Sequence, residues 1–209
     1  MKNKIIMISV LLLAVISFLM GIVKISPMVS AGYEMYQAAT ETISVPDRIE
    51  ELKQQDGYIT FDEIPEEYKA QVLQSEDKRF YYHFGFDPIA TQGPWQIISL
   101  REALCKGGAR LPSSLQKNMY FSFEKKYERK VAELFVAVQL ERELTKDEIL
   151  ELYCNIAYYG EGCYGLKQAA RHYYGVEPLE LTNDQIKALV WTIKSPNNYN
   201  PNAYKGIPV

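Results

Sequence analysis

The sequence predicts a mainly α-helical domain that follows one membrane-spanning helix at the N-terminus. Three observations support this fold class: an uncharged apolar run at residues 5–23, three helix-capping boxes farther along, and the lack of any strand-rich block or internal repeat. Hydrophobic residues make up 47% and charged residues 23% of the 209 positions, so a packed core is expected and general disorder is not.

The N-terminal run IIMISVLLLAVISFLMGIV, residues 5–23, contains no charged residue. At ~1.5 Å per residue it comes close to the ~30 Å hydrocarbon thickness of a bilayer. Lys2 and Lys4 precede the run, which predicts a cytoplasmic N-terminus and an extracytoplasmic main domain. A cleaved signal peptide is the alternative, because Val29-Ser30-Ala31 loosely resembles a cleavage site, but the run is longer than a typical signal core. We therefore interpret residues 1–24 as a cytoplasmic tip and single-pass anchor.

Residues 25–57 are predicted to form a membrane-proximal connector, because they are polar and show no clear periodicity. Within the connector, the stretch SVPDRIEELKQQDG predicts a short helix that Gly57 ends. The main domain then extends over residues 58–209. Inside it, residues 84–125 form an irregular part with several Gly and Pro residues, and irregular segments on a helical scaffold commonly carry binding.

Capping boxes mark three helix starts in the main domain, at Thr60–Glu63, Thr145–Glu148 and Thr182–Gln185. A long helix is predicted from about Tyr127 to Leu144, and the last helix is predicted to end before Pro196. The side chains expected on the buried faces of the helices are Tyr68, Val72, Leu73, Val131, Leu134, Phe135, Val138, Leu140, Ile149, Leu150, Leu152, Tyr153, Ile186, Leu189, Val190 and Ile193.

Charge and cysteine content argue against a nucleic-acid partner and against a structural zinc site. The net charge is −3 with a pI near 5.6, which argues against a nucleic-acid partner. Cys105, Cys154 and Cys163 lack the spacing of a metal-binding pair, so a structural zinc site is not expected. We interpret them as small buried thiols and leave open a Cys154–Cys163 disulfide in an extracytoplasmic domain.

The stretch SEDKRFYYHFGFD, Ser75 to Asp87, concentrates carboxylates, a guanidinium, aromatic rings and a histidine where a helix gives way to a loop. A carboxylate at a helix end beside aromatic surface is partly desolvated, which tunes it for acid–base work. The alternative is a solvated charge cluster that closes the helix.

A second candidate lies in ERKVAELFVAVQLER, where Arg129, Lys130 and Glu133 fall within about one helical turn. The plain interpretation is an i, i+4 ion pair worth a few tenths of a kcal/mol. Because Glu133 falls among apolar residues, the alternative is that it points toward a cleft.

The stretch KGGARLPSSLQKN, residues 106–118, allows two interpretations. Ser114 to Lys117 spells S-x-x-K, the acylation motif of penicillin-interacting serine enzymes. Ser195-Pro196-Asn197 formally supplies their S-x-N, but no K-[ST]-G strand follows it. The flanking glycines and Lys117-Asn118 instead suggest a loop that holds a phosphorylated substrate, which is the interpretation we favour.

Taken in order, these motifs resemble those of the family 51 glycosyltransferases, the peptidoglycan glycan-strand polymerases found alone or as the N-terminal half of bifunctional penicillin-binding proteins. EDKRFYYHFGFD resembles the first motif of that family, E-D-x-x-F-x-x-H-x-G-x-D, and GG…LQKN stands where its second motif stands. RKVAE matches R-K-x-x-E, KDEILELYCNIAYYG matches K-x-x-I-L-E-x-Y-x-N-x-x-x-x-G, and YGLKQAARHYYGVEPLELTNDQIKALVWTIKSPNNYNP is similar to the fifth block. The resemblance covers about residues 58–201.

The resemblance implies a lysozyme-like helical lobe with a small, membrane-proximal, jaw-like lobe at residues 84–125. It implies polymerisation of lipid II into glycan strands with release of undecaprenyl pyrophosphate, at the bacterial cell membrane. The partners would be lipid II, the lipid-linked glycan strand, the membrane and other cell-wall synthesis proteins. A divalent cation, Mg²⁺ or Mn²⁺, is the expected cofactor, and no organic cofactor is expected.

The resemblance also assigns roles residue by residue. Glu76 would be the general base, and Glu133 the second catalytic glutamate, beside the donor pyrophosphate and able to take the divalent cation through it. The expected substrate-binding residues are Gly107, Gly108, Arg110, Lys117, Asn118, Arg129 and Lys130. The residues expected to order the loop of the first motif are Asp77, Arg79, Phe80 and His83.

The second motif departs from the family pattern G-G-S-T-I-T-Q-Q-L-x-K-N, because GGARLPSSLQKN lacks its neutral hydrogen-bonding residues at 109–114. Ala109 and Pro112 cannot replace side-chain hydrogen bonds to phosphate, although Arg110 adds a charge-assisted donor. The alternative function is therefore a membrane-anchored, catalytically impaired relative that binds lipid-linked precursor or a cell-wall synthase partner. A lysozyme-like hydrolase or lytic transglycosylase would also use paired glutamates, but would not explain the basic residues beside both.

Overall fold

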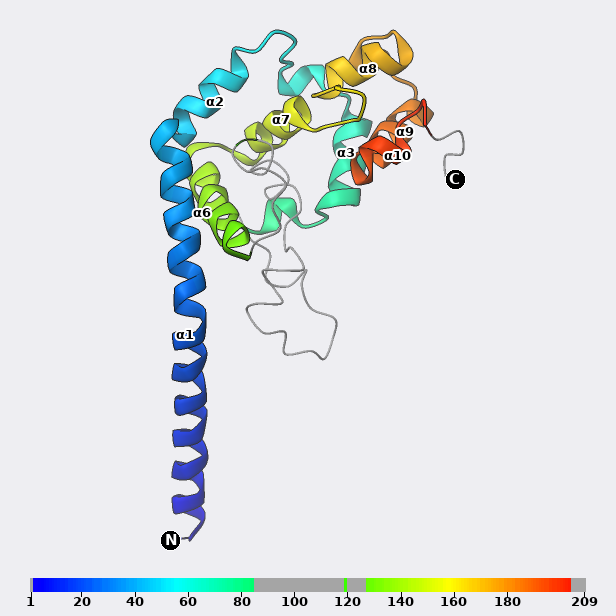
Figure 1. Ribbon diagram of the computed structural model, residues 1–209. Coiled ribbons are helices and arrows are strands. Elements are labelled where there is room, and N and C mark those ends of the chain that lie inside the picture. The colour runs from blue at the N-terminus through cyan, green and yellow to red at the C-terminus, as the bar shows by residue number, and fades with distance from the viewer. Residues whose placement is uncertain (1, 85–118, 120–126, 204–209) are drawn as a thin grey trace.

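The computed structural model describes residues 2–84, 119 and 127–203, and within this part of the chain the protein is mainly helical with no β-strand (Figure 1). The predicted fold class is therefore confirmed. A long N-terminal helix stands beside a compact group of shorter helices. The predictions made for residues 85–118 and 120–126, most of the jaw-like part, lie outside the described residues.

Helix α1 spans Lys2–Thr42 and is much longer than the sequence predicted. It is long and apolar enough to cross a membrane, and its apolar half is unburied. Residues 25–42, which the sequence assigned to a polar connector without clear periodicity, are helical, because α1 passes through Pro27 without ending. The reason is tertiary: the C-terminal part of α1 packs along another helix, and such contacts override weak local periodicity.

The partner of α1 is α6, Tyr127–Glu143, which runs beside it in the same direction (Figure 1). The two helices meet closely at Gly32, where a Cβ atom would lie 2.4 Å from Cβ of Val131. Farther along, the ring of Tyr33 lies edge-on to Phe135, with centroids 5.1 Å apart. Glycine at position 32 therefore permits the close approach of α1 to α6.

Gly32→Leu is expected to separate α1 from α6 and to lower the free energy of unfolding by about 1–3 kcal/mol, as overpacking does. Thermal unfolding of the full-length protein in detergent measures the effect. Gly21→Leu is the matched control, because nothing lies within 4 Å of a Cβ atom at that position in the same helix. Equal unfolding temperatures for the two variants would contradict the role of Gly32.

Helix α2 spans Val45–Lys53 and confirms the short helix predicted in this region. The Ser44 side chain caps it by accepting a hydrogen bond from the backbone N–H of Asp47 at 3.3 Å. The helix ends at Lys53 rather than at Gly57, and Gly57 instead makes the left-handed turn that follows, with φ of 86°.

All three predicted capping boxes are present. The first, however, opens only the 3-10 turn η1, Phe61–Glu63, and α3 begins afterwards, at Glu66–Glu76. The cause is Pro65, which disfavours helical conformation in the residue before it, so Ile64 is extended, with ψ of 124°. The second and third boxes open α7, Lys146–Ile156, and α9, Asn183–Lys194.

The buried face predicted for α6 is partly wrong. Val131 and Leu140 are buried as expected, but Leu134, Phe135 and Val138 are only half-buried. Because α6 lies between α1 and the core, some of its apolar side chains face α1 and others face the core. Small residues such as Ala137 complete the face toward the core.

The C-terminal part contains two helices that the sequence did not predict, and the longer is α8, Leu166–Tyr174. It is followed by the 3-10 turn η3, Pro178–Glu180, and then by α9, which ends before Pro196 as predicted. Pro196 itself begins the short α10, Pro196–Tyr199, since proline suits the first position of a helix.

Helix α7 lies within the core, and its Leu150, Leu152 and Tyr153 are at most 1% exposed. Helix α3 packs against α9 on one side of this core. Cys154 and Cys163 are both buried and free, so the thiol prediction is confirmed for these two and the disulfide is not formed. Cys105 lies outside the described residues.

Candidate active site

Glu76 is the last residue of α3 and is half-buried. The helix ends because Asp77 leaves the helical conformation, with φ of −156°, while its N–H still donates to the Leu73 carbonyl at 2.9 Å. The Ser75 hydroxyl donates to Oε1 of Glu76 at 3.1 Å. The carboxylate is thus partly open to solvent.

Asp77 and His83 form a buried pair immediately beyond α3. His83 Nε2 lies 2.9 Å from Oδ2 of Asp77, and the two side chains are 5% and 4% exposed. Oδ1 of Asp77 accepts the backbone N–H of Arg79 at 3.3 Å. The Phe80 ring lies edge-on to His83, at 6.2 Å between centroids. The structure therefore brings together the four residues predicted to order this loop.

The turn η2, Phe80–Tyr82, is tied to the corner between α6 and α7. The Lys146 ammonium lies 4.4 Å from the centre of the buried Phe80 ring, a cation–π contact. The Tyr81 hydroxyl donates to Asp147 at 2.9 Å. Burial and then this carboxylate raise the pKa of Tyr81 to about 12. These contacts fix the position of the loop that follows Glu76.

Glu133 is buried in α6, with 1% of the residue exposed. Lys130 Nζ donates to its Oε2 at 2.6 Å, and Arg129 Nε lies 3.1 Å from its Oε1. A buried carboxylate is tolerated only when it is paired in this way. The predicted i, i+4 pair of Arg129 and Glu133 is present, but it belongs to a network of two partly exposed cations around a buried carboxylate.

The predicted phosphate loop lies outside the described residues, so the positions of Gly107, Gly108, Arg110, Lys117 and Asn118 stay predictions. No group of three metal-ligating side chains occurs among residues 2–84, 119 and 127–203. Both oxygens of Glu133 already face cations. Its surroundings therefore do not fit a protein-only metal site, and the divalent cation stays a prediction.

Two residues of the fourth motif have structural roles that the sequence did not reveal. The Asn155 side chain accepts the N–H of Ile59 and donates to its carbonyl, both at 2.8 Å. Glu151 accepts the Tyr58 hydroxyl at 2.6 Å and the Phe61 N–H at 2.7 Å. These side chains join α7 to the segment that leads into α3.

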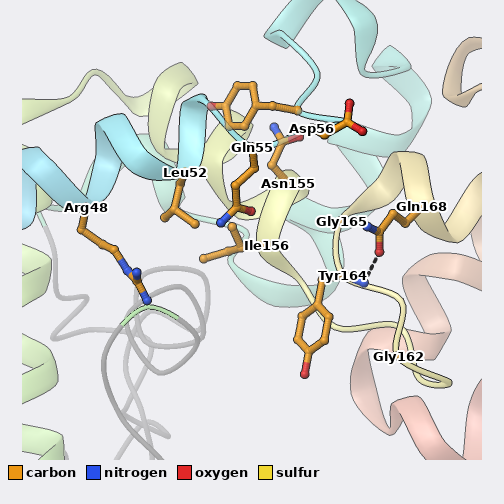
Figure 2. A pocket seen from close by; sticks show the side chains of 12 residues that line it. Arg48, Leu52, Gln55, Asp56, Asn155, Ile156, Gly162, Tyr164, Gly165 and Gln168 are labelled. Atoms are coloured by element: carbon orange, nitrogen blue, oxygen red, sulfur yellow. Dashed lines mark hydrogen bonds between the residues drawn. The ribbon is translucent and has the colours of Figure 1, made fainter.

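Sequence reasoning also missed two cavities. One, of about 420 Å³, lies between α2, α7 and the loop before α8, and Gln55, Asn155 and Tyr164 are among its lining residues (Figure 2). The other, of about 450 Å³, lies between α3 and α9, where Ser75 and Trp191 line it. No local pattern predicts either cavity, because each is lined by residues from segments far apart in the chain.

The chain belongs to a family described as Transglycosylase, whose sequence model matches residues 45–206. It is similar to penicillin-binding protein 1A of Aquifex aeolicus (strain VF5), with 37% identity over 145 residues, 69% of this chain and 20% of that protein. It is also similar to the biosynthetic peptidoglycan transglycosylase of Nitrosomonas eutropha (strain DSM 101675 / C91 / Nm57), with 33% identity over 168 residues, 77% of this chain and 69% of the other. The chain thus spans about a fifth of the Aquifex relative's length.

Proposed function

We propose that this protein is a peptidoglycan glycosyltransferase that polymerises lipid II at the outer surface of the bacterial cell membrane. The observation that carries the proposal is the cluster of Arg129, Lys130 and Glu133, held at the start of α6 beside the anchor helix. Two cations at the positively polarised end of a helix suit an anionic leaving group.

The height of the cluster above the membrane supports this substrate. Val131, next to Lys130, contacts α1 at Gly32, which follows the end of the apolar run at Val23 by nine residues. At ~1.5 Å per residue the cluster lies about 14 Å beyond that end. A pyrophosphate on a lipid stays near the membrane surface, so a soluble phosphate would not need this placement. The cytoplasmic position of the N-terminus is part of the proposal.

The chemistry uses both glutamates. Glu76 takes the proton of the acceptor sugar's 4-hydroxyl, and the hydroxyl oxygen attacks the anomeric carbon of the donor. The bond from that carbon to the pyrophosphate oxygen breaks. Undecaprenyl pyrophosphate leaves with the bonding electrons. Arg129 and Lys130 stabilise the charge that develops on it, while Glu133 holds both cations in place before the substrate arrives.

The specific observation that favours a second function is the altered segment at residues 109–114. A protein without its usual hydrogen-bonding residues could bind lipid-linked precursor, or a synthase partner, without turnover.

The purified full-length protein is expected to convert lipid II in detergent with Mg²⁺ or Mn²⁺ into glycan strands, separated by gel electrophoresis. EDTA should lower the rate if the divalent cation takes part. If no polymer forms where a standard polymerase succeeds, the family-pattern residues are restored at positions 109–114. Activity gained by that change would favour the binding-only function for the natural chain.

A further inference from the structure

The cavity of about 420 Å³ between α2, α7 and the loop before α8 is separate from the candidate catalytic residues, and we call it the distal pocket (Figure 2). Among its described lining residues there is neither Glu76 nor Glu133. Side chains of α2 and α7 line one side of it, and Tyr164 and Gln168 line the other. Its volume is in the range of pockets that bind small ligands. The proposed reaction does not use this pocket, so its occupant has to be inferred from its own chemistry.

The walls of the distal pocket are held in place without a ligand. Arg48 is fixed at both terminal nitrogens, because Nη1 donates to Glu51 at 2.7 Å and Nη2 donates to the Met119 carbonyl at 3.0 Å. On the other side, Oε1 of Gln168 accepts the backbone N–H of Tyr164 at 3.1 Å. A pocket that is formed before its ligand arrives spends little free energy on ordering its walls.

The distal pocket also presents polar groups that the fold leaves unused. The side chains of Gln55 and Asp56 line it and make no hydrogen bond in the described part of the chain. Nε of Arg48 is buried and is likewise unpaired there. A buried donor without a partner is costly, and a ligand oxygen would satisfy it. An amide has both donors and an acceptor, so Gln55 can bind neighbouring polar groups of one ligand.

An exposed aromatic ring adds apolar surface to the pocket. Tyr164 is 56% exposed, and its ring lies against Tyr158 with the centroids 4.8 Å apart. Leu52 and Ile156 line the opposite side (Figure 2). A sugar ring has an apolar face of C–H groups and a polar edge of hydroxyls. An aromatic ring beside amide groups matches both parts of such a ligand.

The charges of the distal pocket disfavour an anionic ligand. Arg48 is the cation among the described lining residues, and both of its terminal nitrogens are already bonded. The Asp56 carboxylate would repel a phosphate or a peptide carboxylate. The pocket therefore fits an uncharged, hydroxyl-rich ligand better than a pyrophosphate.

The height of the pocket above the membrane shows which part of a glycan reaches it. Helix α1 ends at Thr42, and α2 begins at Val45, at the end of α1 opposite the N-terminus (Figure 1). At ~1.5 Å per residue from Val23, α2 lies about 29 Å beyond the apolar run, roughly 15 Å farther out than the cluster around Glu133. A sugar joined directly to a membrane-bound pyrophosphate stays near that cluster, whereas the later units of a glycan strand extend away from the membrane.

We propose that the distal pocket is an accessory glycan-binding site, which takes an uncharged saccharide unit with the sugar face on Tyr164 and the polar edge on Gln55. Two sources carry this chemistry: the strand that the protein makes, and glycan already present in the cell wall. Binding does not require turnover, so only the first source rests on the proposed function.

The probe is chitotetraose, a short uncharged chain of N-acetylglucosamine, added to the full-length protein in a detergent without a sugar headgroup. Isothermal titration calorimetry measures its Kd. Tyr164→Ala should weaken binding about tenfold and Gln55→Ala about fivefold, since one loses the ring and the other loses the amide. Tyr164→Phe keeps the ring and should bind within about twofold of the wild type.

Gln54→Ala is the matched control, because Gln54 is exposed and adjoins Gln55 but does not line the pocket. Its Kd should stay within about twofold of the wild type. Gln55 is also exposed, so Gln55→Ala keeps the test valid if Tyr164→Ala is unstable. A wild type that does not bind chitotetraose would overturn the inference. Binding that Tyr164→Ala and Gln55→Ala leave unchanged, or that Gln54→Ala weakens as much as Gln55→Ala, would also overturn it.

Two further measurements separate the sources. If the pocket holds the strand being made, Tyr164→Ala should produce shorter strands than the wild type from lipid II alone. If it holds wall glycan, the variant should be pelleted less by purified wall glycan. The appearance of neither effect would count against the inference. A wild type that makes no polymer but binds chitotetraose through Tyr164 and Gln55 would refute the proposed function and leave this inference standing.

Discussion

Glu76→Gln is expected to lower the rate of glycan polymerisation by a factor of about 10²–10⁴, the usual contribution of a general base. Glutamine has nearly the same shape and can still accept the hydrogen bond from Ser75, but it cannot take a proton. Because Glu76 is half-buried at the end of α3 and makes no ion pair among the described residues, the fold should not change. The measurement is the polymerisation rate together with the thermal unfolding curve.

Glu67→Gln provides the control for this prediction. Glu67 lies in the first turn of the same helix, is exposed and accepts a hydrogen bond from Gln71 at 2.7 Å. Its replacement should leave the rate within about twofold of the wild type. If Glu76→Gln polymerises as fast as Glu67→Gln, Glu76 is not the base.

Glu133→Gln is expected to reduce both stability and activity. Removing one partner of a buried ion network leaves the opposite charges uncompensated, which costs up to about 3–5 kcal/mol. The side chains of Arg129 and Lys130 are 13% and 29% exposed, so they can turn partly toward water and the cost should be about 2–4 kcal/mol. The two cations, no longer held in place, should also bind the donor pyrophosphate less effectively. Denaturant unfolding and the rate per folded molecule measure the two effects.

Glu141→Gln separates these effects. Glu141 lies at the other end of α6, its side chain is 4% exposed, and it pairs with Lys146 at 2.6 Å. Its replacement should cause a comparable loss of stability, while the rate per folded molecule stays near that of the wild type. Equal rates per folded molecule for the two variants would show that the Glu133 cluster is structural only.

Local signals in the sequence predicted local structure well. Each capping box involves residues three positions apart, and all three occur as predicted. The errors arose where distant segments meet. The helical part of α1 beyond residue 25 follows from packing on α6. Helix α8 follows Gly165, where a Cβ atom would lie 2.5 Å from the Asn155 carbonyl oxygen.

In the candidate site, too, contacts within one helix were predicted and burial was not. The pairing of Arg129 and Lys130 with Glu133 follows from helical spacing, so the sequence predicted the contact. The burial of Glu133 depends on what covers α6, and no spacing rule reports that. Tyr153 was correctly placed in the core, where only 1% of the residue is exposed.

By itself, the sequence determined the apolar N-terminal helix, the helical class, the order of the motifs and the identity of the acidic and basic residues, because these depend on composition and on spacings of a few residues. Only the tertiary structure decided that α1 continues past residue 25 and packs on α6, and that Glu133 is buried. The physical reason is that burial and cross-helix distance are set by packing between segments far apart in the chain, and packing leaves no local signature.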